Sequence, residues 1–525
     1  MSALADQEKL ISALCDSRRY PHPAQSVQVL ETHISWVLLA GRYAYKIKKD
    51  IDLGFLNYAD LKMRRSYCEE EIRLNRRTAP DIYLDVVAIG GSPDDPKFNV
   101  QPAIEYAVRM HRFASDNLMD RLLMCGKLTS RHIDTLAATI AHFHVGLPSV
   151  DTGSQHGTPA SILKAAKQNF ELLQIRMTEE ADKENIASSM HATEREFDAC
   201  KSIFDARRAQ GFVRECHGDL HLGNITLFDG VPVPFDCIEF NPALRWIDVM
   251  DEIAFAMMDM LHCNHPEFAW HFLNAVLEVG GDYAGTSVLR FYLAYRATVR
   301  AKVAAIRSGQ RGISKRARLQ ELEACRSYLA LARQCLALRQ AALIITHGLP
   351  GSGKSTFSQF VLEQMGAIRI RSDVERKRLY GLSALQDSHA NVGGIYGHDA
   401  TKRTYARLHE LARQVLMAGF TVIVDAAFLQ REEREQFREL AQSMSVPFAI
   451  ASLHASDAEL HDRIRQRSND ASEADVGVLK KLQQVQQPLS SDESKFAVNF
   501  TTEQAPNSKA NSQNWSQLKR MLAPS

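Results

Sequence analysis

The chain has 525 residues, which suits about three structural units at roughly 150 residues each. Its content of 45% hydrophobic and 24% charged residues excludes disordered and fibrous proteins. With 63 basic and 62 acidic residues the net charge is only +1, so no overall charge attracts nucleic acid or anionic lipid. We expect phosphate binding to be local, and we expect no nucleic-acid partner.

The sequence has no feature of export or membrane insertion. Its nine cysteines contain no CxxC pair, which is typical of reduced thiols rather than of a zinc ribbon or a disulfide framework. Asp6 and Glu8 interrupt the amphipathic start, so no signal peptide is expected. No window reaches the roughly 18 to 20 apolar residues of a membrane-spanning helix. We expect a cytoplasmic protein without a membrane partner.

The first 115 residues are predicted to form a small, strand-rich lobe. Residues 27–49 are rich in Val, Ile, Tyr and Trp with a turn signal at Ala40-Gly41, which predicts an antiparallel hairpin. Three further elements are expected: a helix over 61–77, a strand over 81–87 and an edge strand over 104–110.

Residues 116–340 are predicted to form a mainly helical second lobe with a short strand region at 213–240. Because neither Gly nor Pro occurs between Ile313 and His347, the last helix should run stiffly into the next strand. From there the order strand, glycine loop, helix, strand, helix, strand predicts a P-loop domain with a doubly wound parallel sheet over 341–500. A polar tail is expected over 501–525, and its part over 501–514 is expected to be mobile.

A kinase-like catalytic loop is predicted within the helical lobe. Residues 217–224 read HGDLHLGN, which has the D-x4-N spacing of such loops. Two apolar runs follow, joined by the favoured hairpin turn Asp229-Gly230, and this turn sets a register in which Asn224 faces position 235 and Asp236 lies diagonally beside it. Asn224 and Asp236 are therefore expected to share one magnesium ion, and Asp219 to accept the proton of the attacking hydroxyl. Turn and cap roles for these residues are the structural alternative.

These residues resemble those of the aminoglycoside-phosphotransferase and choline-kinase-like superfamily, whose catalytic loop reads HGDxxxxN. The likeness extends over about residues 25–335 and implies a bilobal, protein-kinase-like domain. It also implies that Lys46 pairs with the α and β phosphates of ATP and that Glu71 is its acidic partner. Lys48 on the same strand face, and Glu69 or Glu70 in place of Glu71, remain open.

Residues 105–108 and the acids Asp248 and Asp251 are two further features of this region. Residues 105–108 (EYAV) resemble the hinge whose backbone reads the adenine edge. Asp248 and Asp251 are expected to brace the catalytic loop or to cap a helix.

A P-loop is predicted where the C-terminal sheet begins. Residues 348–355 read GLPGSGKS and match GxxxxGK[ST] between an apolar strand and a helix, as the motif requires. Glycines let backbone N–H groups converge on phosphate oxygens, Lys354 bridges the β and γ phosphates, and the Ser355 hydroxyl holds magnesium. The expected nucleotide-binding residues are Gly348, Gly351, Ser352, Gly353, Lys354, Ser355 and Thr356.

Acids and arginines near this P-loop are candidate catalytic residues. Asp425 ends the buried run 421–425, and Asp373 follows the next predicted strand, so both should lie at the carboxyl edge of the sheet where ligands gather. Arg463 and Arg467 are spaced i, i+4 on one face of a predicted helix and could close over a transferring phosphate. Helix caps and surface salt bridges are the alternatives for these four residues.

Residues 341–500 resemble the P-loop kinases of small molecules, such as gluconate, adenylylsulfate and chloramphenicol kinases, within the wider AAA and zeta-toxin-like group. The resemblance implies that the segment with the two arginines is a lid and that the acid after the second strand engages the acceptor hydroxyl. The two modules in this order resemble bacterial bifunctional aminoglycoside phosphotransferase/ATP-binding proteins.

The combined prediction is an ATP- and Mg²⁺-dependent phosphotransferase with two nucleotide sites and small-molecule hydroxyl acceptors. No acidic cluster suited to a polycationic antibiotic is evident beyond Glu179-Glu180 and the acids at 182–184. One alternative makes the N-terminal module a nucleotide-binding sensor that regulates a C-terminal NTPase switch. Another makes the P-loop domain a polynucleotide 5′-hydroxyl kinase, which would need a basic channel for the strand.

Overall fold

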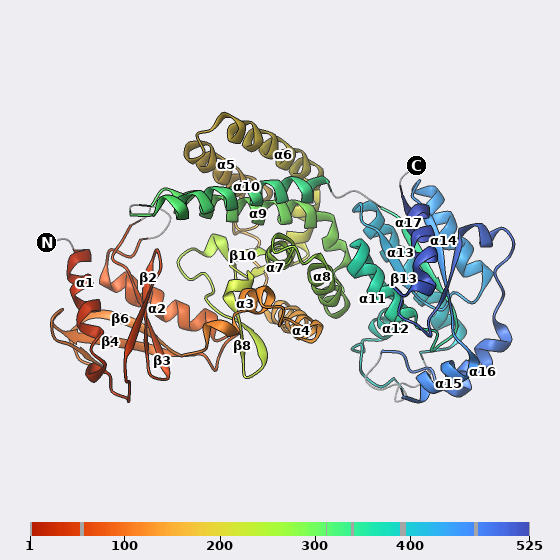
Figure 1. The fold of residues 1–525 in the computed structure, drawn as a ribbon, viewed down its shortest axis with the longest axis horizontal. Coiled ribbons are helices and arrows are strands. Elements are labelled where there is room, and N and C mark those ends of the chain that lie inside the picture. Colours follow the sequence, from red (N-terminus) through yellow and green to blue (C-terminus); the bar gives the residue numbers. More distant parts are fainter. Residues whose placement is uncertain are drawn as a thin grey trace. The chain divides into compact units, whose positions relative to one another are not determined.

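The computed structural model describes residues 3–52, 57–310, 312–337, 341–388, 395–466 and 471–523. The chain divides into two compact units (Figure 1). The first comprises Met1–Leu136, Phe143–Ile162 and Asp205–Ala256; the second comprises Ala137–His142, Leu163–Phe204 and Met257–Ser525. This division cuts through the predicted second lobe, because several of its helices share a unit with the C-terminal sheet.

The first unit is built around an antiparallel sheet. Its helices and strands are α1 (Ala3–Leu14), β1 (Val27–Glu31), β2 (Ser35–Ala40), β3 (Tyr43–Lys48), α2 (Leu61–Asn75), β4 (Tyr83–Gly91), β5 (Pro96–Phe98), β6 (Ala103–His111), α3 (Met119–Met124), β7 (Val213–Glu215), β8 (Ile225–Phe228), β9 (Val231–Pro234) and β10 (Trp246–Asp248). Four helices carry residues of both units: α4 (Ser130–Gly146), α5 (Pro159–Arg176), α6 (Glu180–Ala209) and α7 (Val249–His262).

The six strands of this sheet run in the order β1-β2-β3-β6-β4-β5. One face is covered by α1, whose Leu14 is buried with Leu38 and Ala107. The other face is covered by α2, whose Ile72 is buried with Val108. Strand β6 therefore contributes to both cores and lies between β3 and β4, so its prediction as an edge strand over 104–110 was wrong. A strand with both faces buried belongs inside a sheet.

The second unit combines helices with a parallel sheet. Its own elements are α8 (Pro266–Gly280), α9 (Thr286–Ser308), α10 (Lys315–Ala337), β11 (Leu343–His347), α11 (Lys354–Met365), β12 (Ile368–Arg371), α12 (Ser372–Leu379), α13 (His398–Met417), β13 (Val422–Asp425), α14 (Arg431–Ser443), β14 (Phe448–His454), α15 (Asp457–Gln466), α16 (Val476–Val485), β15 (Ala497–Thr501) and α17 (Ser512–Leu522).

The strands of this sheet run in the order β12-β13-β11-β14-β15, and every pair is parallel. Alternate residues of β11 point to opposite faces. Ile344 packs in a core with Phe357 of α11, while helices α13 and α14 lie against β13 and β11. Helices thus cover both faces, as the predicted doubly wound fold requires, and the predicted fold class is confirmed.

The C-terminal segment over 501–525, which we expected to be a polar tail, contributes a helix to the core. Helix α17 buries Leu518 and Leu522 in the core that contains Phe357 and Phe500. The spacing of Trp515, Leu518 and Leu522 places all three on one face of the helix, and the polar residues between them hid this pattern. Among the described residues, no helix is both long enough and apolar enough to cross a membrane.

Candidate active sites

The predicted catalytic loop of the first unit, residues 217–224, leads into a two-stranded hairpin. Strands β8 and β9 pair with Ile225 opposite Pro234, and Phe235 N donates to Asn224 O at 2.9 Å. The register predicted from the Asp229-Gly230 turn is therefore confirmed. It places Asn224 just before the first strand of the hairpin and Asp236 just after the second.

Asp219 and Asn224 are in direct contact across the loop. Asn224 Nδ2 donates to Asp219 Oδ2 at 2.9 Å and to the Asp219 carbonyl at 3.0 Å. Gly218 adopts a φ of 88°, and a Cβ at this position would lie 2.7 Å from the carbonyl oxygen of Leu244, so only glycine fits. The loop therefore holds the Asp219 carboxylate in one defined place.

The buried side chain of Glu252 supports this loop through hydrogen bonds to its backbone. Glu252 Oε1 accepts hydrogen bonds from the backbone N–H groups of His217 (2.5 Å) and Gly218 (2.8 Å), and its Oε2 lies 2.6 Å from His144 Nε2. Burial opposes ionisation, but His144, His217 and the backbone donors outweigh it and lower the pKa of Glu252. Sequence reasoning missed Glu252, because it contacts a loop 35 residues before it in the chain.

Asp248 and Asp251 were expected to brace the loop or to cap a helix, and neither takes the position of Glu252. Asp248 forms a bidentate ion pair with Arg207, at 2.7 and 2.8 Å, and accepts from Met250 N at 2.8 Å. It therefore caps the start of α7, as the cap alternative expected. Asp251 is buried on the same helix.

Lys46 and Lys48 of β3 share one carboxylate of α2. Lys46 Nζ lies 2.8 Å from Glu71 Oε1, and Lys48 Nζ lies 2.7 Å from Glu71 Oε2. Lys46 Nζ also lies 2.5 Å from Asp236 Oδ1, whereas Lys48 contacts Glu239. The structure thus brings Lys46, Glu71 and Asp236 together.

The charges in this cluster stabilise one another. Burial alone would lower the pKa of Lys46, but the Asp236 and Glu71 carboxylates raise it well above its usual value. Burial alone would raise the pKa of Glu71, but the two lysines lower it to about 2. Both side chains are therefore ionised at neutral pH.

The other predicted partners of Lys46 lie elsewhere. Glu69 pairs with Arg65 at 2.8 Å on the exposed face of α2. Glu70 pairs with Arg73 at 2.7 Å. The shared magnesium site of Asn224 and Asp236 stays a prediction: Asn224 contacts Asp219, and Asp236 contacts Lys46.

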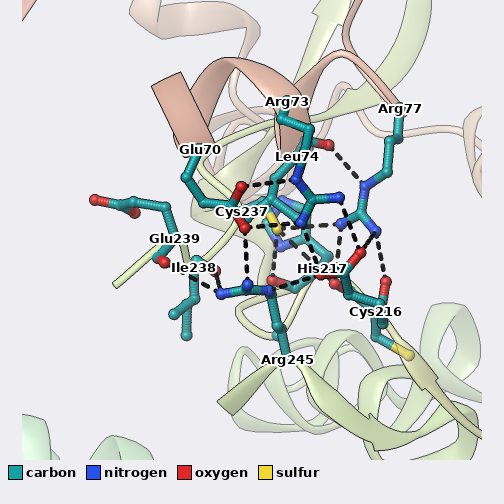
Figure 2. A network of polar contacts seen from close by, with 12 residues as sticks. Glu70, Arg73, Leu74, Arg77, Cys216, His217, Cys237, Ile238, Glu239 and Arg245 are labelled. Carbon is teal, nitrogen blue, oxygen red and sulfur yellow. Dashed lines mark hydrogen bonds and ion pairs between the residues drawn. The ribbon is translucent and has the colours of Figure 1, made fainter. Parts of the chain in front are cut away.

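Figure 2 shows an arginine network that ties α2 to the catalytic loop. Arg77 donates to the carbonyls of Glu215 at 2.6 Å and Cys216 at 3.2 Å, the two residues before the HGD motif. Arg73 reaches Glu215 Oε1 at 2.7 Å, and Arg245 joins Glu70 Oε1 at 2.8 Å. The helix that carries Glu71 is therefore fixed to the strand that leads into the loop.

The adenine-reading role expected for residues 105–108 is wrong. These residues lie inside β6, where Val108 pairs with Lys46 on one side and with Val86 on the other. Ala107 and Val108 are paired on both sides and Glu105 and Tyr106 are paired with β4, so this segment is part of the sheet and not a hinge. The Glu105 side chain is buried and accepts from Arg64 Nε at 3.0 Å.

The P-loop of the second unit joins β11 to α11, as predicted. Gly353 has a φ of 81°, a backbone conformation that favours glycine, and Lys354 Nζ donates to the carbonyls of Gly348 (3.0 Å) and Leu349 (2.8 Å). Within the described part of the chain, the buried Ser352 hydroxyl oxygen has no hydrogen-bond partner. A buried polar atom without a partner inside a glycine loop suits a phosphate oxygen.

A cavity of about 800 Å³ opens at this P-loop. Asp425 at the end of β13 is buried, and it accepts from Ser358 Oγ at 3.0 Å. Asp373 lies in the first turn of α12. The predicted residues that line the cavity together are Gly351, Gly353, Lys354, Ser355, Thr356, Asp373, Asp425 and Arg463.

Of the two arginines that were expected to close over a phosphate, the structure describes one. Arg463 donates to the Gly351 carbonyl at 3.2 Å and to the Thr502 carbonyl at 2.6 Å, so its guanidinium spans from α15 to the P-loop backbone. Arg467 lies outside the described residues.

Several cavity residues were not predicted as site residues. Arg376 is buried, with one guanidinium nitrogen 3.0 Å from the Ile395 carbonyl and 3.3 Å from Thr401 Oγ1. Burial raises the pKa of Glu433, which also lines the cavity. Glu433 lies three residues after Gln430 in a capping box, which is why its pattern indicated only a helix start.

Comparison with known proteins finds a family match in the C-terminal part of the chain and a relative that covers most of it. Residues 343–489 match the AAA_33 family, described as an AAA domain. The uncharacterized protein Rv2004c of Mycobacterium tuberculosis (strain ATCC 25618 / H37Rv) is 28% identical over 464 residues, covering 88% of this chain and 90% of that protein.

Two solved structures are similar to different parts of the chain. The amicoumacin kinase hAmiN, in complex with AMP-PNP, Ca²⁺ and Ami, is 14% identical with a TM-score of 0.40, covering 62% of this chain and 94% of that one. A gluconokinase from Sinorhizobium meliloti 1021 is 20% identical with a TM-score of 0.26, covering 35% of this chain and 95% of that one.

Proposed function

We propose that the protein is an ATP- and magnesium-dependent phosphotransferase with two nucleotide sites, each of which passes a phosphoryl group to a hydroxyl of a small molecule. The observation that supports the proposal is that each unit contains a lysine, an acid and oxygen ligands: Lys46 contacts Asp236 and Asn224 contacts Asp219 in the first, and Lys354, Ser355 and Asp425 line one cavity in the second. The balanced charge of the chain favours small acceptors over nucleic acid.

The residues present fit magnesium and a triphosphate. Amide, hydroxyl and carboxylate oxygens are the ligands that magnesium takes beside water and nucleotide phosphates. Asn224 and Asp236 would hold it in the first site, and Ser355 with Asp425 in the second. When bound, magnesium supplies positive charge that offsets the phosphate oxygens. The orphaned Ser352 hydroxyl adds a donor for a phosphate oxygen of the nucleotide.

In the first site, Asp219 is the proton acceptor. The acceptor hydroxyl oxygen bonds to the γ phosphorus while the bond from this phosphorus to the β–γ bridging oxygen breaks, and the hydroxyl proton goes to an Asp219 carboxylate oxygen. Asn224 holds that carboxylate through its 2.9 Å hydrogen bond. Lys46, held by Glu71 at 2.8 Å, would bind the nucleotide phosphates.

In the second site, the P-loop and the lid would hold the nucleotide while the far side of the cavity takes the acceptor. Lys354 and Arg463 lie on the P-loop side, and Asp373 and Arg376 lie on the side of α12. A cavity of about 800 Å³ is large enough for a triphosphate and a small acceptor. Asp373 would accept the acceptor proton there.

The test compares variants of the full chain. ADP formation and phosphate transfer are measured over a panel of small hydroxyl compounds and oligonucleotides for wild type, Asp219→Ala and Lys354→Ala. We expect each variant to lower turnover at its own site by about 10² to 10⁴-fold and to leave the other site active. Excess chelator should abolish both activities.

The outcomes separate the three hypotheses. Loss of turnover with Lys354→Ala alone would make the first site a sensor. Transfer to oligonucleotides alone would make the second site a polynucleotide kinase. Unchanged nucleotide turnover in both variants would refute the proposal.

A further inference from the structure

Helix α8 covers the edge strand β12 of the parallel sheet, in the same compact unit. The side chain of Asn274 is buried there: its Nδ2 donates to the Ala367 carbonyl at 3.0 Å, and its Oδ1 accepts from Arg369 N at 2.7 Å. One amide group therefore satisfies a backbone donor and a backbone acceptor of an edge strand, as a neighbouring strand would. These two hydrogen bonds fix the position of α8 along β12.

Glu278 lies one turn further along α8, on the same face as Asn274. Its Oε1 lies 2.7 Å from Arg369 Nε and 2.6 Å from a terminal nitrogen of the same guanidinium. Its Oε2 lies 3.5 Å from a terminal nitrogen of Arg371. The side chains of the three residues are 13%, 10% and 17% exposed, respectively. One shielded carboxylate is therefore shared by two arginines of β12.

Each of these arginines also reaches the P-loop site. Arg369 lies 3.5 Å from the carbonyl oxygen of Ser355, the serine expected to hold magnesium. Arg371 Nε lies 3.9 Å from Asp425 Oδ2, and the two residues are register partners on β12 and β13. Glu278 is therefore linked to Ser355 through Arg369 and to Asp425 through Arg371.

We propose that Glu278 is a positioning residue for magnesium-bound nucleotide at the P-loop, and that it acts by holding Arg371 away from Asp425. A separation of 3.9 Å is a loose ion pair, at the outer limit of direct contact. Without the negative charge of Glu278, the Arg371 guanidinium moves closer to Asp425 and competes with magnesium for its carboxylate. The inference rests on the proposed function, because it requires the P-loop to bind magnesium and nucleotide.

The experiment titrates Mg²⁺ against the full-length protein in the presence of a fluorescent, non-hydrolysable ATP analogue. The share of binding that is lost in Lys354→Ala belongs to the P-loop. For that share, Glu278→Gln should raise the half-saturating Mg²⁺ concentration about tenfold, as changes next to metal ligands do. Nucleotide binding measured with EDTA should stay the same.

Two further variants separate this role from a structural one. In Glu278→Gln/Arg371→Gln, the competing guanidinium is gone, so the Mg²⁺ midpoint should return to the wild-type value. Damage to packing would not be repaired by a second substitution. Glu267→Gln, a matched change on the same helix whose carboxylate contacts His265, should leave the midpoint unchanged.

Each result has a defined meaning. An unchanged midpoint in Glu278→Gln, with a P-loop share that Lys354→Ala removes, overturns this inference and leaves the proposed function standing. Absence of any Lys354-dependent share overturns the proposed function instead. If Glu278→Gln does not fold, Arg371→Gln decides: a midpoint at or below the wild-type value supports the inference, and a raised midpoint overturns it.

Discussion

The two candidate sites hold their lysines in different ways. Lys46 is held by side chains that are distant in sequence, namely Glu71 of α2 and Asp236 after the hairpin. Lys354 is held by two carbonyls of its own loop, six and five residues before it. A site of the first kind depends on buried charges that must stay balanced, whereas a site of the second kind depends on backbone conformation. The two lysines should therefore be sensitive to different changes.

The largest effect is expected from removing the shared charge of the first site. Glu71→Gln should lower the free energy of unfolding of the first unit by about 3 to 5 kcal/mol, because two buried lysines lose a common partner. Urea unfolding followed by far-UV circular dichroism measures this loss. A change below about 1 kcal/mol would mean that Asp236 and Glu239 suffice to balance the lysines.

Acid should remove the stabilisation that the Glu71 carboxylate provides. The pKa of Glu71 lies at about 2 in the folded protein against an ordinary value of 4.5, so its contribution is complete above pH 4.5 and is lost as the pH falls toward 2. The difference in unfolding free energy between wild type and Glu71→Gln should therefore shrink across that window. A constant difference for Glu71→Gln would contradict the assigned ionisation.

A smaller effect is expected from straining the backbone of the second site. Gly353→Ala places a side chain at a φ of 81°, which should cost about 1 to 2 kcal/mol of stability and weaken nucleotide binding at the P-loop. The matched control is Gly381→Ala, with a φ of 70° and open space around the new Cβ. It should lose similar stability while binding nucleotide normally. Equal loss of nucleotide binding in both variants would remove the special role of this loop.

The smallest effect on the unfolding free energy is expected from Glu69, which lies on the exposed face of α2. Glu69→Gln removes an exposed pair with Arg65, so the unfolding free energy should change by less than about 1 kcal/mol. Differential scanning calorimetry of this variant beside Glu71→Gln gives the contrast directly. A loss as large as that of Glu71→Gln would show that helix propensity, rather than the buried charge, governs both.

The features that could be predicted from the sequence depend on residues close together in the chain. The hairpin register follows from a two-residue turn, and the P-loop follows from eight consecutive residues, so both were found. Glu252 contacts a loop 35 residues away, and Arg245 meets Glu70 across 175 residues, so no short pattern indicates either contact. The central position of β6 was missed because the sequence of one strand does not determine which strands pair with it on each side. Helix α17 was missed because polar residues separate the apolar residues of its buried face.

The amide of Asn274 bears on how this protein can be divided for experiments. A fragment that began at residue 341 would keep every P-loop residue but would lose α8, leaving the Ala367 carbonyl and the Arg369 N–H of the outermost strand open to solvent. Unprotected strand edges recruit strands from other molecules, so such a fragment should self-associate as its concentration rises. Solubility, measured by light scattering, would then reveal the missing helix before any assay of activity did.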